Sequence, residues 1–328
     1  MKKGHLVIAV VAVALFTFVI AHMRLPSMMQ QLKAIRIALP IVVALSTLRL
    51  FLQSLTWSTS LKGQNISVDK TKLAAVRLAS QSMGYLTVLG PVISVPMKIN
   101  LLGTPAEPTI TATFLDDGVY WFTSALIAIA GIFSLPFVAV HGASYHWISP
   151  ILLLALTIFI IIKRRNPILS GVVRAFGERH PSWLVRAEKS EASIRTFRVE
   201  HPALVSKIFW IDIACQSLIA SEVVVVLLAL HLPIHFFALL AIEGVTRSLK
   251  LVSGWIPARL GSDEGGAISA FAMAGFSPTL GLALALTRRV RDLLGALIGI
   301  IWLAWNSRSV SDHQEPAASL PTVMKEVL

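Results

Sequence analysis

Long apolar runs separated by short polar or charged segments make up most of this chain of 328 residues. The clearest runs cover residues 6–21, 37–55, 116–140, 147–162, 203–232 and 235–255. A transmembrane helix needs about 20 predominantly apolar residues, so these runs predict helices that cross a bilayer. The pattern therefore predicts an all-α polytopic membrane protein with about six to eight transmembrane helices.

Two segments interrupt this pattern with prolines, glycines and charges. The first covers residues 73–102, and the second covers residues 256–286, between the apolar run that ends near Trp255 and the cluster Arg288–Asp292. Backbone that Pro and Gly free at membrane depth is tolerated only where it is buried in protein or lines a wet cavity. Each segment therefore predicts a re-entrant helix pair, and the alternative for the second is a surface turn between two spans.

The two interruptions also resemble each other. Val76-Arg77 followed by Gly84 parallels Thr246-Arg247 followed by Gly254. Paired interruptions in two halves of a transporter point to a central binding site, because the ends of half-helices then face the substrate. We expect one membrane domain over residues 1–305, with an inverted repeat of halves 1–163 and 164–305, and a disordered tail over 306–328. The alternative to a repeat is that such breaks occur often in membrane chains.

Composition supports a membrane location and narrows the partners. The chain is 55% hydrophobic and 14% charged, with a formal net charge of +12. In such a chain excess cation marks cytoplasmic loops and contacts with anionic lipid headgroups, and nothing interleaves basic and aromatic residues as nucleic-acid binding would require. The lone Cys215 excludes an intrachain disulfide and a cysteine-cluster metal site, and we expect neither a metal nor a cofactor.

Charge also suggests the topology. Lys2 and Lys3 precede the run 6–21, which no convincing cleavage site follows, so we expect an uncleaved first span in the inner (cytoplasmic) membrane with a cytoplasmic N-terminus. The basic stretch 163–200 predicts a cytoplasmic loop. Apolar residues near 168–176 within it predict an amphipathic surface helix, with a solvated linker as the alternative.

Charged residues within apolar runs are functional-site candidates by default. A lipid phosphate needs cationic partners inside a cavity, and arginine offers a bidentate, permanently charged group for it. Glu264 would hold one of the arginines in place or accept a positive headgroup. Asp212 and Glu222, ten residues apart, should share a helix face that points to the interior. The candidate substrate-binding residues are Arg49, Arg77, Arg247, Arg259, Asp263, Glu264 and Arg288.

The order and spacing of Pro257, Gly261, Glu264, Gly275 and Arg288 resemble the membrane domain shared by lysylphosphatidylglycerol synthases and the flippase-like family that includes the archaeal AglD proteins. Hopanoid-biosynthesis-associated membrane proteins are similar relatives. The likeness extends to Leu48-Arg49, Gly90 through Leu101 and Asp116-Asp117, and it covers about residues 6–305.

The resemblance adds Lys98 to the substrate-binding candidates, and it implies structural roles for Gly90, Pro257, Gly261 and Gly275. Two departures stand out. Val92 to Val95 fill a loop that is richer in glycine in the family, and Arg259 replaces a small residue. Arg259 is therefore either a phosphate contact peculiar to this chain or a cytoplasmic anchor.

The resemblance implies a lipid translocase or flippase-like protein for an anionic, aminoacylated or polyprenyl/hopanoid-type lipid, not an enzyme, and no catalytic residue is assigned. Only about twenty residues follow Trp305, where the synthases carry their soluble aminoacyl-transferase domain.

One alternative is a membrane glycosyl- or headgroup-transferase, with Asp116-Asp117 binding a metal–nucleotide sugar and Glu264 as base. These acids would otherwise open a helix and meet its dipole. Another is a non-catalytic partner of a lipid-synthesis complex. Expected partners are a membrane lipid, a second copy or a lipid-synthesis enzyme, and no nucleic acid.

Overall fold

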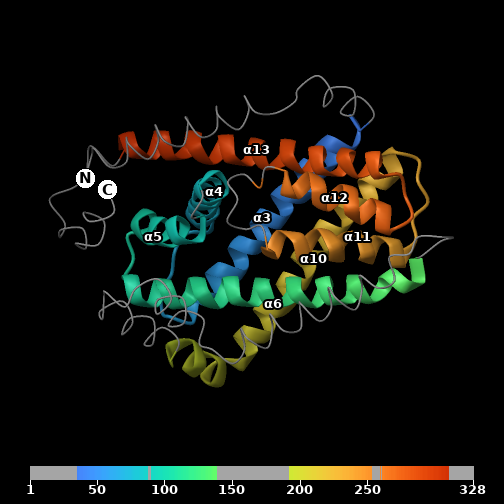
Figure 1. Cartoon of the computed structure of the whole chain (residues 1–328). Coiled ribbons are helices and arrows are strands. Elements are labelled where there is room, and N and C mark those ends of the chain that lie inside the picture. Colours follow the sequence, from blue (N-terminus) through green and yellow to red (C-terminus); the bar gives the residue numbers. More distant parts are fainter. Residues whose placement is uncertain (1–34, 88–89, 139–191, 253–258, 260, 310–328) are drawn as a thin grey trace, which may run out of the picture.

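The computed structural model describes residues 35–87, 90–138, 192–252, 259 and 261–309, which form helices and turns with no strand among them (Figure 1). The all-α prediction is confirmed. Three described helices are long and apolar enough to cross a membrane: α3 (Ala38–Lys62), α6 (Ala106–Val138) and α10 (Pro202–Ala229). Other predicted features lie outside the described residues, namely the spans 6–21 and 147–162, the surface helix near 168–176, Pro257 and residues 310–328.

The same succession of four helices occurs twice. The first set is α3, α4 (Lys70–Leu86), α5 (Gly90–Leu102) and α6, with 25, 17, 13 and 33 residues. The second set is α10, α11 (Phe236–Val252), α12 (Ser262–Met273) and α13 (Pro278–Ser309), with 28, 17, 12 and 32 residues. Residues 192–200 are also helical and precede α10.

The two sets, called the first and second half below, are interlocked. The helix α4 of the first half packs on α13 of the second, α11 packs on α6, and α3 packs on α10. The long helices α6 and α13 lie on opposite sides of the bundle and run in opposite directions (Figure 1). This arrangement supports an inverted repeat, the architecture in which transporters place their binding sites between the halves.

The first broken segment forms a pair of short helices, α4 and α5, as predicted, but the prediction for the second is wrong, because its two pieces are the short α12 and the beginning of the 32-residue α13. The short helix pair of the second half is instead α11 and α12. At 1.5 Å per residue, the 17 residues of α4 or α11 span about 26 Å, and α5 and α12 are shorter still. Gly261 precedes α12 with φ +81° and Gly275 follows it with φ +79°, a conformation that side chains disfavour. Each half therefore places a short helix pair between its longer first and last helices.

Three details of the predicted boundaries are wrong. The cluster Arg288–Asp292 does not end a helix, because α13 runs through it to Ser309 and its arginines are buried against carboxylates. Asp116 and Asp117 do not open a helix, since α6 already begins at Ala106. Residues 306–309, assigned to the tail, belong to α13.

A close backbone contact fixes how the halves interlock. A Cβ atom added to Gly131 of α6 would lie within 2.5 Å of the Cα atom of Gly244 of α11. Only glycine at both positions lets these helices approach so closely. The apolar core beside this contact joins helices of both halves, with Leu135, Val223, Ile242, Phe271 and Leu284 among its buried residues.

Candidate functional site

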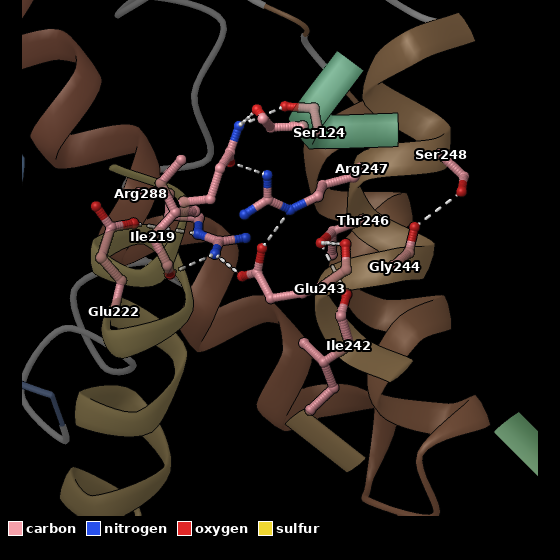
Figure 2. A network of polar contacts seen from close by, with 12 residues as sticks. Ser124, Ile219, Glu222, Ile242, Glu243, Gly244, Thr246, Arg247, Ser248 and Arg288 are labelled. Atoms are coloured by element: carbon pink, nitrogen blue, oxygen red, sulfur yellow. Dashed lines mark hydrogen bonds and ion pairs between the residues drawn. The ribbon is translucent and has the colours of Figure 1, made fainter. Parts of the chain in front are cut away.

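Buried arginines and carboxylates on α10, α11 and α13 form a continuous network in the second half (Figure 2). Glu243 accepts hydrogen bonds from Arg247, at 2.9 Å between Nε and Oε2, and from Arg288. Glu222 pairs with the same Arg288, at 3.5 Å, and with Arg291. All five side chains are at most 7% exposed, so their charges interact in a medium of low dielectric constant.

The network continues from Arg247 to uncharged groups on α6 and α10. The Gln216 Oε1 atom accepts a hydrogen bond from Arg247, and Gln216 Nε2 donates to Thr123 Oγ1 at 3.0 Å and to Ser124 Oγ at 2.9 Å. Thr123 in turn lies 2.5 Å from a carboxylate oxygen of Asp212. Both acids of α10, Asp212 and Glu222, are thus buried, as their shared helix face predicted.

A smaller group of ion pairs joins α4, α5 and α6 in the first half. The Arg77 Nη1 atom lies 2.7 Å from Asp116 Oδ2, and both side chains are at most 4% exposed. The Lys98 Nζ atom lies 3.5 Å from Asp117 Oδ2 and 5.3 Å from the ring centre of the fully buried Trp57. Each of the two aspartates therefore forms an ion pair with a basic side chain, which gives no support to a metal–nucleotide site.

The two groups of ion pairs occupy matching positions in the two helix sets, with their signs reversed. Asp116-Asp117 and Arg288-Arg289 lie at the same distance from the starts of α6 and α13. Arg77 and Glu243 likewise lie at the same distance from the starts of α4 and α11. The pair Arg77–Asp116 of the first half thus corresponds to the pair Glu243–Arg288 of the second. The earlier alignment of Arg77 with Arg247 is wrong by one helical turn.

The first helices of the halves show the same reversal. Arg49 and Gln53 on α3 are four residues apart, as are Asp212 and Gln216 on α10, and Ser-Leu follows the glutamine in both. Each glutamine accepts a hydrogen bond from an arginine on the second helix of its own half, although the two arginines are not equivalent: the backbone carbonyl oxygen of Gln53 accepts from Arg77, and the side-chain oxygen of Gln216 accepts from Arg247. Arg49 itself bonds Ser46 Oγ at 3.3 Å.

The start of α12 carries a third cluster. Glu264 pairs with Arg289 at 2.6 Å and also accepts a hydrogen bond from the Gly261 N–H group at 2.9 Å. Arg259, which pairs with Asp263 at 3.9 Å, lies 5.5 Å from the ring centre of Tyr85. Glu264 therefore holds an arginine in place, the first of the two roles considered for it.

A small pocket with both charged and apolar lining residues lies beside this cluster, between α11, α12 and α13. The Nζ group of Lys250 has no carboxylate of the described residues within 4.0 Å, and the Oδ1 atom of Asp263 has no hydrogen-bond partner among them. The pocket therefore offers an unpaired ammonium group next to the N-terminus of α12, where backbone N–H groups favour anions. Its lining residues are Thr246, Lys250, Ser262, Asp263, Gly266, Ala267, Ala285 and Arg288.

Comparison with known protein families identifies the family of this chain. The model of the lysylphosphatidylglycerol synthase transmembrane region matches residues 5–299. The chain belongs to this family. It is therefore a membrane protein of lipid metabolism or lipid transport. Searches of curated proteins and of solved structures found no match.

The family-like residues fall into different clusters. The predicted candidates Arg247 and Arg288 meet in the central network, whereas Arg259, Asp263 and Glu264 form the cluster at α12. Several partners in these clusters were not among the predicted binding residues, although the i, i+4 spacing of Glu243 and Arg247 and the run of arginines after Thr287 were available signals. These additional residues are Thr123, Gln216, Glu222, Glu243, Lys250, Arg289, Arg291 and Asp292.

Proposed function

We propose that this protein moves lipids with anionic headgroups between the leaflets of the cytoplasmic membrane. Family membership supports a role in lipid handling, and the interlocked halves resemble the transporter architecture in which a central site is reached from either side. The observation that carries the proposal is the charge of the buried and half-buried network, in which cations exceed carboxylates.

The excess of cations over carboxylates is counted over the described charged residues whose side chains are buried or half-buried among the helices. The cations are Arg49, Arg77, Lys98, Arg247, Lys250, Arg259, Arg288, Arg289 and Arg291, and the carboxylates are Asp116, Asp117, Asp212, Glu222, Glu243, Asp263, Glu264 and Asp292. A cation at membrane depth is costly without a counter-charge. A lipid phosphate supplies that counter-charge, and Lys250 presents its ammonium group in a pocket where a phosphate oxygen is a suitable partner.

Several guanidinium nitrogens support the same substrate chemistry. Within the described part of the chain, Arg77 Nε, Arg247 Nη2 and Arg289 Nε are buried and donate no hydrogen bond. Buried donors are normally satisfied, so unsatisfied ones in a cluster favour a polar ligand that fills them. Phosphate oxygens accept such donors in a bidentate manner.

The test uses the purified full chain in liposomes that contain a trace of fluorescent phosphatidylglycerol. Exchange between leaflets is followed by quenching the outer leaflet with a membrane-impermeant reductant. Lys250→Gln should slow exchange about tenfold, because a charge-assisted hydrogen bond contributes about 1.5–3 kcal/mol. The fold should persist, because no carboxylate among the described residues loses a partner within 4.0 Å.

The matched control is Lys207→Gln, which changes an exposed lysine on α10 and should leave the rate unaltered. Equal rates in Lys250→Gln and Lys207→Gln would remove the pocket from the proposal. A wild-type rate equal to that of protein-free liposomes would remove lipid movement itself. Transfer of sugar from a nucleotide-sugar donor to lipid by the purified chain would replace it with a transferase.

A further inference from the structure

We infer that Asp212 binds a proton that is taken up together with the anionic lipid, so that lipid movement is coupled to the proton gradient. The inference rests on the proposed lipid movement and adds an energy source to it. It depends on the surroundings of one carboxyl group on α10 and on its connection to Arg247.

Asp212 is a buried acid without a cation. Its side chain is 3% exposed, and no Lys or Arg side chain in the described part of the chain lies within 4.0 Å of it. Its hydrogen-bond partner among those residues is the hydroxyl group of Thr123, at 2.5 Å. An ionised carboxylate without a counter-charge is expensive to bury, and binding a proton removes that cost. The other buried acids differ, because Asp116, Glu222 and Glu243 each have an arginine partner.

The hydrogen bonds around Thr123 favour the same protonated form. Arg247 donates to Gln216 Oε1, which fixes the amide so that Gln216 Nε2 is the donor to Thr123. The carbonyl oxygen of Tyr120, 3.0 Å from Thr123 Oγ1, can only accept. The single hydroxyl hydrogen of Thr123 satisfies Tyr120 when Asp212 donates a proton of its own. A protonated Asp212 therefore satisfies every contact of this hydroxyl, whereas an ionised one removes its hydrogen from Tyr120.

Other charged groups face Asp212 from the helices that surround it. The acid Asp116 on α6 opposes ionisation, while Arg77 on α4 and Arg247 on α11 favour it, and Cys215 is the titratable neighbour on α10. The charge of Arg49 on α3 acts on the neighbouring Cys215, and Arg288 of α13 lies further along α10, where it donates to the Ile219 carbonyl oxygen. No ion pair within 4.0 Å joins Asp212 to any of these described cations, so its charge is decided by their balance.

Arg247 connects the proton to the lipid. Its Nη1 atom is held by Gln216, one hydrogen bond from Thr123, and its Nη2 atom is buried without a partner among the described residues. When Asp212 is ionised, its carboxylate attracts the guanidinium group and competes with a lipid phosphate for it. When Asp212 is protonated, that competition ends. Proton binding and anionic lipid binding therefore strengthen each other, by reciprocal linkage.

The proton balance follows directly. A proton from one aqueous side binds a carboxylate oxygen of Asp212 as the lipid headgroup enters, and the same proton leaves to the other side as the headgroup departs. With one proton for each lipid, every unit of pH difference supports about a tenfold accumulation of the lipid in the leaflet on the alkaline side.

The experiment applies a pH difference of about one unit across liposomes that hold the full chain and a trace of labelled phosphatidylglycerol. Wild-type protein should enrich the labelled lipid about tenfold in the leaflet on the alkaline side. Asp212→Asn, which keeps the shape and has no exchangeable charge, should abolish the enrichment. The control Glu107→Gln, at an exposed acid in the first turn of α6, should respond as wild type does.

Two other results would distinguish a failure of the proton coupling from a failure of lipid movement itself. Wild-type exchange that is rapid but indifferent to the pH difference would overturn the coupling and leave lipid movement intact. Exchange at the protein-free rate would overturn both. Infrared difference spectra of wild type minus Asp212→Asn, measured at neutral pH, show whether the Asp212 side chain is protonated. The carbonyl band of a protonated carboxylic acid should appear in wild type, and its absence would overturn the assignment of the proton to Asp212.

Discussion

Arg77 and Glu243 occupy equivalent positions in the two halves and carry opposite charges. Each lies seven residues after the start of a 17-residue helix, Lys70 for α4 and Phe236 for α11. Each pairs with the long final helix of its own half, through Asp116 or Arg288. The two halves therefore hold buried ion pairs at matching positions with opposite signs.

The pair in the first half should be strongly coupled. Arg77→Met leaves Asp116 buried without its cation, and removing one partner of a buried ion pair costs about 3–5 kcal/mol. The double variant Arg77→Met/Asp116→Leu should recover most of that loss, because no charge remains uncompensated. Unfolding in detergent, followed by circular dichroism, measures both. A double variant as unstable as the single one would show that the two residues do not act as a pair.

The contact between α6 and α11 should not tolerate side chains. Gly131→Val places atoms against the backbone of α11, and overpacking of this kind costs about 1–3 kcal/mol or more. Gly118→Ala is the matched change on the same helix, since a Cβ atom there meets nothing within 4 Å. It should be neutral or stabilise by up to about 1 kcal/mol. Equal melting temperatures for the two variants would contradict the close approach.

The first turn of α4 should respond to acid. The Asp69 carboxylate accepts hydrogen bonds from the N–H groups of Thr71 and Lys72, and the hydroxyl hydrogen bond from Thr71 lowers its pKa from 3.8. A lowered pKa in the folded state means that its contribution is complete above pH 3.8 and is lost as the pH falls through the folded value. The stability difference between wild type and Asp69→Ala should therefore be present at pH 7 and shrink in acid. A difference that is constant across this range would refute the cap.

Gln216 should set how firmly Arg247 is held. Gln216→Glu replaces a neutral acceptor by a carboxylate, so Arg247 gains an ion pair and becomes less available to a phosphate. We expect leaflet exchange of labelled phosphatidylglycerol to slow about tenfold, with the protein still folded. Ser217→Ala, at the exposed neighbouring position, serves as the control. An unchanged rate in Gln216→Glu would exclude Arg247 from the lipid path.

The sequence was sufficient to locate the first long helix of each half. The apolar runs 37–55 and 203–232 overlap α3 and α10, because a helix that contacts lipid must remain apolar over about 20 residues. The breaks near Gly90 and Gly261 were also visible, since Gly and Pro disfavour regular helix. Hydropathy failed at Arg288–Asp292, where charges within one helix are compensated by Glu222 and Glu243 from other helices.

The register of the repeat could not be read from residue types alone. Matching Arg77 with Arg247 follows chemical likeness, but the equivalent of Arg77 is an acid. The shared Gln-Ser-Leu after Arg49 and Asp212 was a visible likeness of the first helices, but it does not fix the register of the second helices, because carrying it forward without a gap would place Arg77 opposite Leu240 rather than Glu243.

Sign reversal also has an energetic consequence for the whole molecule. Two identical inverted halves would give the inward-open and outward-open shapes of a transporter equal free energies by symmetry. Here acids line α6 and arginines line α13, so the core is electrically polarised from one long helix to the other. For the transporter proposed above, we therefore expect the two shapes to differ in free energy and the empty protein to have a preferred side of access.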